Sequence, residues 1–123
     1  EKYKGCPTGS AVLTGAGRLK AKYVIHAVGP VYSGKAQDAK LLAGAYRTCL
    51  ELCSEHHISS IAFPSISTGA YGYPAGEAAQ VAIEADTAYV RTHPEIKLVR
   101  FVLFDDRTLD AYQSAYAQLA AVR

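Results

Sequence analysis

The chain contains no methionine, no tryptophan and no asparagine, and it has only three cysteines among its 123 residues. The lack of methionine leads us to expect that a segment in front of the first residue has been removed. Three cysteines cannot all pair with one another and their spacing fits no small disulfide framework, which favours a reducing compartment, by default the cytoplasm. No apolar run approaches the roughly 18 residues needed to cross a bilayer, and no basic-then-apolar leader opens the chain. The sequence therefore predicts no membrane segment and no secretion signal.

The composition of the chain is that of a single packed domain over residues 1–123. Half of the residues are hydrophobic and 20% are charged, which allows a core and excludes disordered, collagen-like and coiled-coil chains. The net charge is +2, but residues 1–47 hold eight Lys or Arg against two acids, and residues 48–123 hold five against nine. This asymmetry favours an anionic ligand at one face. Without a run of five like charges, it does not favour nucleic acid as the main partner.

Hydrophobic periodicity and turn residues predict four strands and three helices in the order β-β-α-β-α-β-α. Strands are expected at 11–14, 23–28, 61–66 and 97–104, and helices at about 36–57, from Pro74 to before His93, and after Asp105. Pro64 predicts an irregularity in the third strand, because proline donates no ladder hydrogen bond. The last strand is the most apolar stretch and is expected to be buried and parallel. Strands that alternate with helices favour a parallel sheet covered on both faces.

Each predicted helix carries an apolar face for the core. These faces comprise Leu42, Tyr46, Cys49, Leu50 and Cys53; then Ala78, Ala79, Ala82 and Ile83; and finally Leu109, Tyr112, Tyr116 and Leu119. Tyr73 is likewise interpreted as a packing residue.

A loop with two glycines follows the third strand, from Ser67 to Pro74. In open α/β sheets ligands bind outside the carboxyl ends of strands, and glycines let consecutive backbone N–H groups converge on an anion such as phosphate. The loop has no lysine after its second glycine, so it is not a Walker loop and does not favour Mg²⁺-dependent triphosphate hydrolysis. The competing interpretation is a structural turn that holds a tyrosine.

Three segments resemble macrodomains, the ADP-ribose-binding family. The segment FPSISTGAYGYP at 63–74 is similar to their diphosphate-binding segment. Residues 5–30 resemble the stretch that leads into and through an inner strand of that fold, and FVLFDD at 101–106 resembles its last strand and adenine-side turn. The resemblance covers nearly the whole chain and is closest to the bacterial O-acetyl-ADP-ribose deacetylase and mono-ADP-ribosyl hydrolase branch. It implies a three-layer α/β/α sandwich with a mixed, mostly parallel sheet.

The resemblance also implies a ligand site. Backbone N–H groups of the loop would surround the pyrophosphate, Tyr71 would pack against the distal ribose, and Phe104 would flank the adenine. The implied ligand-binding residues are Ser65, Ser67, Thr68, Gly69, Ala70, Tyr71, Gly72 and Phe104. The implied partners are ADP-ribose or O-acetyl-ADP-ribose and ADP-ribosylated proteins, with no metal, no cofactor and no membrane.

Several family segments have no counterpart in this chain: two first strands, an acidic residue that reads adenine, an Asn-rich strand end and the glycine-rich loop credited with hydrolysis. We therefore interpret the chain as the C-terminal two-thirds of a macrodomain that lacks its first strands, and the catalytic residues stay unassigned. By the family's strand order, one absent strand would lie between the strands at 23–28 and 61–66. These two strands are expected not to pair directly, and the chain alone is expected to be unstable.

The resemblance leaves three functions open. One is an ADP-ribosyl ester hydrolase in the intact protein, and another is a non-catalytic reader of ADP-ribosylated proteins. The third is a general nucleotide- or RNA-binding domain that uses the basic first part of the chain.

Other groups of residues suggest a metal site, a catalytic residue or a dinucleotide-binding motif, but a structural role explains each group better. Cys49, Cys53, His56 and His57 suggest zinc, but core packing fits the helical spacing better. His26 in a strand is more readily a core histidine than a base, and Cys6 lacks an evident partner for nucleophilic chemistry. Helix capping explains Asp105 and Asp106 better than an acid–base cluster with Asp110, which is expected to be solvated. The glycines at 15 and 17 indicate a turn and not a dinucleotide fingerprint.

Overall fold

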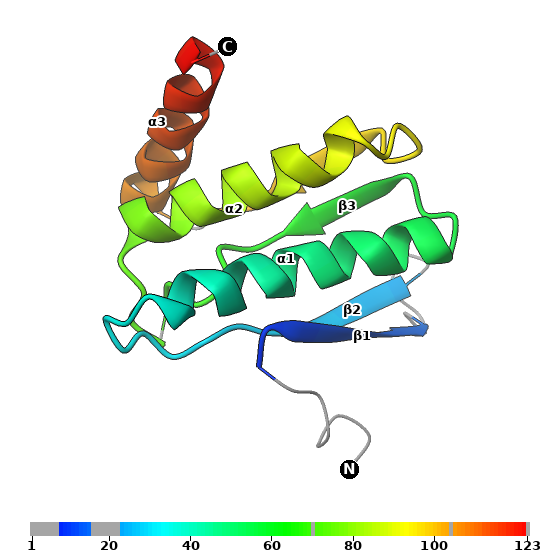
Figure 1. Ribbon diagram of the computed structural model, residues 1–123, viewed down its shortest axis with the longest axis horizontal. Coiled ribbons are helices and arrows are strands. Elements are labelled where there is room, and N and C mark those ends of the chain that lie inside the picture. Colours follow the sequence, from blue (N-terminus) through cyan, green and yellow to red (C-terminus); the bar gives the residue numbers. More distant parts are fainter. Residues whose placement is uncertain (1–7, 16–22, 70, 104, 123) are drawn as a thin grey trace.

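A computed structural model describes residues 8–15, 23–69, 71–103 and 105–122 of the chain. The element order is the one predicted from the sequence (Figure 1). The strands are β1 (Ser10–Gly15), β2 (Tyr23–Val28), β3 (Ser60–Phe63) and β4 (Leu98–Phe101), and the helices are α1 (Gln37–Glu55), α2 (Ala75–Arg91) and α3 (Asp106–Val122). In these described ranges no helix is long and apolar enough to span a bilayer.

The strands form two separate pairs. β1 and β2 are antiparallel, whereas β3 and β4 are parallel and joined by α2, so the strand pairing is mixed. β2 and β3 share no ladder in the described part of the chain, as expected of two strands with an absent strand between them. A cavity of about 1030 Å³ lies between them and is lined by Ile25 and Ala27 of β2, all of β3, and Cys49 and Cys53 of α1. One edge of each of these strands therefore faces this space and not another strand.

Two strand predictions need correction. β3 ends at Phe63, immediately before Pro64, because proline lacks the N–H that would continue the ladder. β4 is parallel to β3 as predicted, but it is not buried: Leu98 is 46% exposed and Val102, just beyond its end, is 47% exposed. An apolar run predicts burial only if both faces and both edges are covered, and β4 has a strand on one side only in the described chain.

α1 provides the centre of the core. Its predicted apolar stripe is buried throughout, with Leu42, Tyr46, Leu50 and Cys53 fully inaccessible. Each such aliphatic or aromatic side chain contributes roughly 1.5–3 kcal/mol by leaving water. Burial raises the pKa of the Cys53 thiol to about 11, so this cysteine is protonated and acts as a small core residue.

α2 lies beside α1 and packs closely because its inner face is made of small residues (Figure 1). The predicted alanine face is fully buried, and the helix ends at Arg91, ahead of the His93-Pro94 pair as expected. The same face continues one turn further to Asp86, which is only 4% exposed. The spacing of three and four residues from Ile83 and Ala82 predicts this burial, although the sequence interpretation did not extend that far.

α3 packs against α2 and begins at a side-chain cap. The Thr108 N–H donates to Asp105 Oδ1 over 2.8 Å, which confirms the capping role of Asp105. Tyr112 is buried, but two residues assigned to the same apolar face are not: Leu109 is 42% and Tyr116 63% exposed. The packing prediction for Tyr116 is therefore wrong, because α2 covers only part of the α3 surface.

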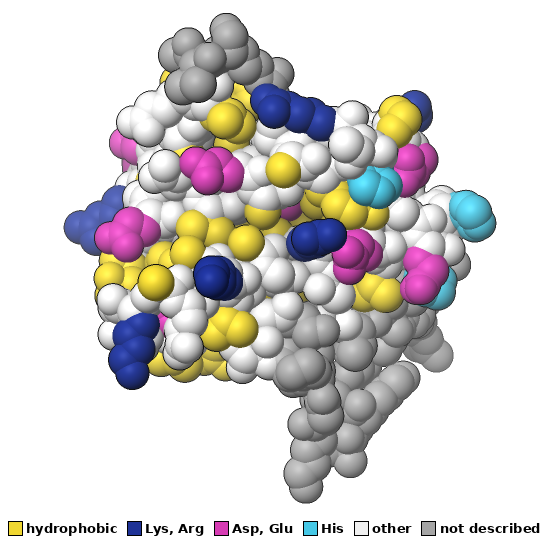
Figure 2. Space-filling view, viewed as in Figure 1, with side chains coloured by type: hydrophobic (Ala, Val, Ile, Leu, Met, Phe, Trp, Pro, Cys, Tyr) yellow, Lys and Arg dark blue, Asp and Glu magenta, His cyan; other side chains and the backbone are white. Residues whose placement is uncertain are grey.

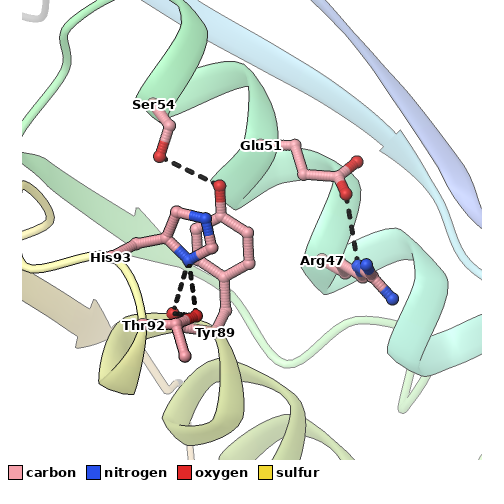
Figure 3. Close-up of polar contacts among 6 residues, drawn as sticks. All are labelled: Arg47, Glu51, Ser54, Tyr89, Thr92 and His93. Atoms are coloured by element: carbon pink, nitrogen blue, oxygen red, sulfur yellow. Dashed lines mark hydrogen bonds and ion pairs between the residues drawn. The ribbon is translucent and has the colours of Figure 1, made fainter.

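A polar cluster fastens α2 to α1 near their C-terminal ends (Figure 3). The Tyr89 hydroxyl donates to Ser54 Oγ over 2.9 Å, and Ser54 donates to Glu95 over 2.7 Å. The His93 ring stacks on Tyr89 with ring centres 3.8 Å apart. These contacts fix the turn that leads from α2 into β4.

Candidate functional site

The segment 65–72, here named the 65–72 loop, lies between β3 and α2, at the carboxyl end of the parallel strand pair. The carboxyl end of β2 presses against it. A Cβ built on Gly29, which follows β2, would collide with Ser67 Oγ and Ile66 Cγ2. Only glycine leaves room for this approach, so the end of β2 and the loop form one unit.

Buried tyrosine hydroxyls of α1 and α3 hydrogen-bond to the start of the loop. The Ile66 N–H donates to the Tyr46 hydroxyl over 3.2 Å, and the hydroxyls of Tyr46 and Tyr112 are 3.2 Å apart. Ser65 Oγ lies 2.9 Å from the same Tyr112 hydroxyl. The pKa values of both tyrosines are raised, chiefly by burial, so the phenols stay protonated and can serve as donors as well as acceptors. This chain of hydroxyls connects α1 and α3 to the loop and fixes where it begins.

Hydrogen bonds inside the loop then set its shape. The Thr68 hydroxyl donates to the Ser65 carbonyl over 3.1 Å, the Gly72 N–H donates to Gly69 O over 3.0 Å, and the Tyr73 N–H donates to Ser67 O over 2.9 Å. Gly72 has a φ of 73°, a left-handed conformation that glycine adopts without strain. The loop is thus a closed turn with its own internal bonds.

Other N–H groups of the loop are not used by these bonds. Within the described residues, the N–H groups of Ser67, Thr68, Gly69 and Tyr71 donate to no other group of the chain. Gly69 and Tyr71 are exposed, and Ser67 and Thr68 are half-buried. Uncommitted N–H groups on a rigid turn are the donors that suit phosphate oxygens, particularly beside the N-terminus of a helix such as α2.

Ser67 has two features that set it apart in the loop. Its φ is 70°, a left-handed conformation that is unusual for a residue with a side chain, and its buried Oγ has no hydrogen-bond partner among the described residues. Both features cost free energy of folding, and such strain concentrates where a loop is built for a ligand.

We expect Ser67→Gly to raise the free energy of unfolding by up to about 1 kcal/mol relative to Ser67→Ala, because only glycine relieves the left-handed backbone. Urea unfolding of the two variants measures the difference. Both variants remove the hydroxyl, so the comparison isolates the backbone. Equal stability of the two would contradict a strained Ser67.

A second segment lies against the loop, from Gly29 to Asp38. The Tyr32 N–H donates to the Tyr71 carbonyl over 2.9 Å, and the Tyr32 ring lies 5.1 Å from the buried ring of Tyr73. The sequence interpretation missed Tyr32. The sequence did contain a signal for Tyr32: the Gly-Pro-Val-Tyr run directly follows β2, and the carboxyl end of β2 lies against the loop that follows β3.

Asp38 keeps this second segment in shape. Its carboxylate accepts hydrogen bonds from the Ser33 N–H over 2.8 Å, the Ser33 hydroxyl over 2.8 Å and the Gly34 N–H over 3.0 Å. The hydrogen bond from the Ser33 backbone is the main cause that lowers the pKa of Asp38 below its usual range. The sequence interpretation gave no role to this aspartate, although a Ser-Gly turn just ahead of a helix is a common signal for such a contact.

The structure brings most of the predicted site residues together. Those that lie in the described loop are Ser65, Ser67, Thr68, Gly69, Tyr71 and Gly72. Ala70 and Phe104 lie outside the described residues. Tyr73 is 4% exposed, which confirms its interpretation as a packing residue, and Tyr71 is 44% exposed, so its ring is accessible from solvent.

The other chemical interpretations are less well supported by the structure. Cys49 and Cys53 are buried on α1, while His56 and His57 are exposed beyond its end. In the described ranges no three His, Cys, Asp or Glu side chains are close enough to hold a metal ion. Asp110 is exposed, as expected. Cys6, the side chain of His26 and the turn at 16–17 lie outside what the structure describes.

On the face that carries α1 and α2, the arrangement of charged side chains does not favour nucleic-acid binding. Figure 2 shows Lys and Arg interspersed with Asp and Glu on this face, with hydrophobic side chains between them. A continuous basic stripe, the feature that tracks a phosphate backbone, is not visible there.

A family model for the macro domain matches residues 1–82, two thirds of the chain. This chain belongs to the macro domain family. A macro domain-containing protein of Caldanaerobacter subterraneus is 54% identical over 120 residues, which cover 97% of this chain and 68% of the relative. An O-acetyl-ADP-ribose deacetylase of Salmonella typhimurium is 47% identical over 114 residues, which cover 92% of this chain and 64% of the relative.

Solved structures agree in fold. A macrodomain of Oceanobacillus iheyensis with ADP superposes with a TM-score of 0.90 at 38% identity, covering 95% of this chain and 62% of the other. A Trypanosoma brucei macrodomain in complex with ADP-ribose superposes with a TM-score of 0.84 at 32% identity, covering 91% and 47%. The macro domain chain described here thus has the α/β macrodomain fold and spans about two thirds or less of the length of these proteins.

Proposed function

We propose that this macro domain chain binds ADP-ribose at the 65–72 loop and that the complete protein hydrolyses O-acetyl-ADP-ribose or ADP-ribosyl esters on proteins. The observation that carries the proposal is that the N–H groups of Ser67, Thr68, Gly69 and Tyr71 donate to no other described group, on a loop whose start is held by the Tyr46 hydroxyl. The name of the Salmonella relative, and the ADP and ADP-ribose bound by the two macrodomain structures, support the same ligand.

The binding chemistry follows from the loop. A diphosphate carries two negative charges, and N–H dipoles that are already oriented stabilise them without a metal ion. The N-terminus of α2, which begins at Ala75 directly after the loop, adds the positive end of its dipole. The exposed Tyr71 ring offers an apolar face to the distal ribose, and Phe104 is proposed to flank the adenine.

In the proposed reaction a water molecule attacks the ester carbonyl. The bond between the acyl carbon and the ribose oxygen breaks, and acetate and ADP-ribose leave; a protein ester would instead release ADP-ribose and regenerate the carboxylate. The loop would contribute by holding the diphosphate so that the ester and water meet in a reactive geometry. The polar side chains of the described loop are hydroxyls and a phenol, with no carboxylate or imidazole among them, so the proton acceptor must come from elsewhere in the complete protein or from the substrate.

That same lack of a carboxylate or imidazole in the described loop favours a second candidate, a reader that binds ADP-ribosylated proteins without cleaving them. Release of acetate from O-acetyl-ADP-ribose by the complete protein distinguishes the two. Saturable binding without turnover would favour the reader.

Titration calorimetry with ADP-ribose tests the binding proposal, and three substitutions of Gly69 give it a matched control. Apart from its chain neighbours, no described residue has an atom within 4 Å of a Cβ added at Gly69, and its φ is not positive, so Gly69→Ala is expected to bind like the original chain. Gly69→Glu is expected to lose roughly 100-fold in affinity, because it brings a carboxylate close to the diphosphate. Gly69→Gln has nearly the same size without the charge and is expected to lose less than about tenfold.

Equal affinity of the glutamate and glutamine variants would show that no phosphate lies near Gly69. Unchanged affinity in all three variants would exclude the loop as the ADP-ribose site.

A further inference from the structure

The segment 31–36, which leads from β2 into α1, is exposed along its whole length. Two residues after it, Asp38 in the first turn of α1 is only 3% exposed. The Asp38 carboxylate accepts three hydrogen bonds from Ser33 and Gly34. α1 is itself fixed in the core by the fully buried Leu42, one turn further on. Asp38 therefore ties an exposed segment, which has no regular secondary structure of its own, to a rigid helix.

This segment holds the 65–72 loop at one peptide group. In the described chain, the only hydrogen bond from the segment to the loop is the one from the Tyr32 N–H to the Tyr71 carbonyl. The Gly72 N–H, which belongs to the same peptide group, donates to Gly69 O. Because the C=O and N–H of a trans peptide point in opposite directions, the two bonds together fix the plane of this group. Gly72 would not fix it alone, since glycine adopts positive and negative φ with similar ease.

We propose that Asp38 is a positioning residue for ADP-ribose. By holding the turn at 33–34, it keeps the Tyr32 N–H against the Tyr71 carbonyl. The Tyr71 ring is thereby kept in the orientation that receives the distal ribose. A loop that is fixed before the ligand arrives loses less conformational entropy on binding, which raises affinity. The inference rests on the proposed function, because it concerns the same loop, and it assigns a role to a residue that does not touch the ligand.

Electrostatics alone predicts the opposite effect of Asp38. Its carboxylate is negative, and a negative charge near the loop repels a diphosphate. Asp38 is close enough for its charge to be felt there: burial first, and then the charge of Asp38, raises the pKa of Tyr73, which directly follows the loop. If Asp38 acted only through its charge, its removal would strengthen binding. A loss of affinity on its removal therefore distinguishes positioning from repulsion.

Two substitutions separate the hydrogen bonds of Asp38 from its charge. Asp38→Ala removes both. Asp38→Asn removes the charge but keeps the bonding pattern, because its amide oxygen accepts from the Ser33 and Gly34 N–H groups while its NH2 group donates to Ser33 Oγ. We expect calorimetry to show that Asp38→Ala binds ADP-ribose about tenfold more weakly than the original chain, and that Asp38→Asn stays within about threefold.

ADP, which carries the diphosphate without the distal ribose, tests whether Tyr71 is the residue affected. Asp38→Ala should lose less than about threefold in affinity for ADP, so that its preference for ADP-ribose over ADP falls. A variant that is merely less folded would lose the same factor for both ligands, because apparent affinity scales with the folded fraction. Amide exchange at Tyr32 should become at least about tenfold faster in Asp38→Ala and stay unchanged in Asp38→Asn.

Ser33→Ala keeps the test decisive if Asp38→Ala does not fold. It removes one of the three hydrogen bonds to Asp38, at an exposed position where the loss of a hydroxyl does not prevent folding. We expect this variant to lose about threefold in affinity for ADP-ribose and to bind ADP like the original chain. Unchanged binding of both ligands, together with an unchanged exchange rate at Tyr32, would contradict the proposal.

Ser54→Ala is the matched control, since it removes the hydrogen bonds to Tyr89 and Glu95 at the other end of α1. It should keep the affinity for both ligands and the exchange rate of Tyr32. Failure of the original chain to bind ADP-ribose would overturn the proposed function, and this inference with it. Binding that is unchanged or stronger in Asp38→Ala, or an equal loss for ADP-ribose and ADP, would overturn this inference alone.

Discussion

Between pH 5 and pH 9, the free energy of unfolding of the chain is expected to fall by about 4 kcal/mol more than that of its Asp86→Asn variant. Burial raises the pKa of Asp86 to about 8, whereas an unfolded aspartate has a pKa near 3.9. Across this interval the folded state still holds a proton that the unfolded state has lost, so each rise of one pH unit favours unfolding by about 1.4 kcal/mol until the folded pKa is passed. The contribution is thus lost as the pH rises, the reverse of an aspartate in a salt bridge.

Urea unfolding followed by circular dichroism at pH 5, 7 and 9 measures this effect. Asp86→Asn keeps the size and polarity of the side chain but cannot ionise, so its pH profile reports all other groups. Glu84→Gln, exposed on the same helix, should keep the profile of the original chain. If the profiles of the original chain and Asp86→Asn run parallel, the carboxylate is paired or solvated in solution, which contradicts its burial without a hydrogen-bond partner among the described residues.

Replacement of Gly29 by alanine is expected to destabilise the chain by about 1–3 kcal/mol and to weaken ADP-ribose binding more than 100-fold. The new Cβ would occupy the space of Ser67 Oγ and Ile66 Cγ2. Both side chains would have to move at once, on a backbone that is itself held, because Ser67 has a left-handed conformation and the Ile66 N–H is bound to the Tyr46 hydroxyl. The loop itself must shift, and overpacking of this kind typically costs 1–3 kcal/mol. Urea unfolding and calorimetry with ADP-ribose measure the two effects.

Two further variants make this prediction specific. Gly76→Ala changes a helical glycine of α2 whose added Cβ would meet no atom of the other described elements within 4 Å, so it should be neutral or slightly stabilising. The double variant Gly29→Ala with Ser67→Gly removes one of the two colliding atoms and should recover part of the lost stability, which gives a non-additive cycle. Strict additivity would show that the end of β2 and the loop do not touch as described.

The sequence was sufficient for the elements and for the position of the loop. Alternation of apolar runs with turn residues predicted the order of strands and helices, and the spacing of Leu42, Tyr46 and Cys53 predicted the face of α1 that is buried. Prolines marked the end of β3 and the start of α2. Such features depend on local periodicity and backbone geometry, which a single sequence carries directly.

The sequence predicted burial less accurately, because burial depends on how much of a helix or strand is covered by its neighbours. The apolar run 97–104 predicted a buried strand, yet Leu98 and Val102 are about half exposed, because the described chain covers β4 on one side only. Tyr116 has the right spacing for the core and is 63% exposed, since α3 extends past the surface that α2 covers. Periodicity identifies the apolar side of a helix but not the length over which another element packs on it.

By itself, the amino-acid sequence determined the succession of elements, the family resemblance and the loop that could hold a diphosphate. Only the tertiary structure decided which N–H groups of that loop donate to no other described group, that Gly29 must stay small for Ser67, and that Asp86 is buried with no hydrogen-bond partner among the described residues. The physical reason is that propensity and periodicity act over a few residues. Hydrogen-bond satisfaction and steric room depend on groups brought together from distant parts of the chain.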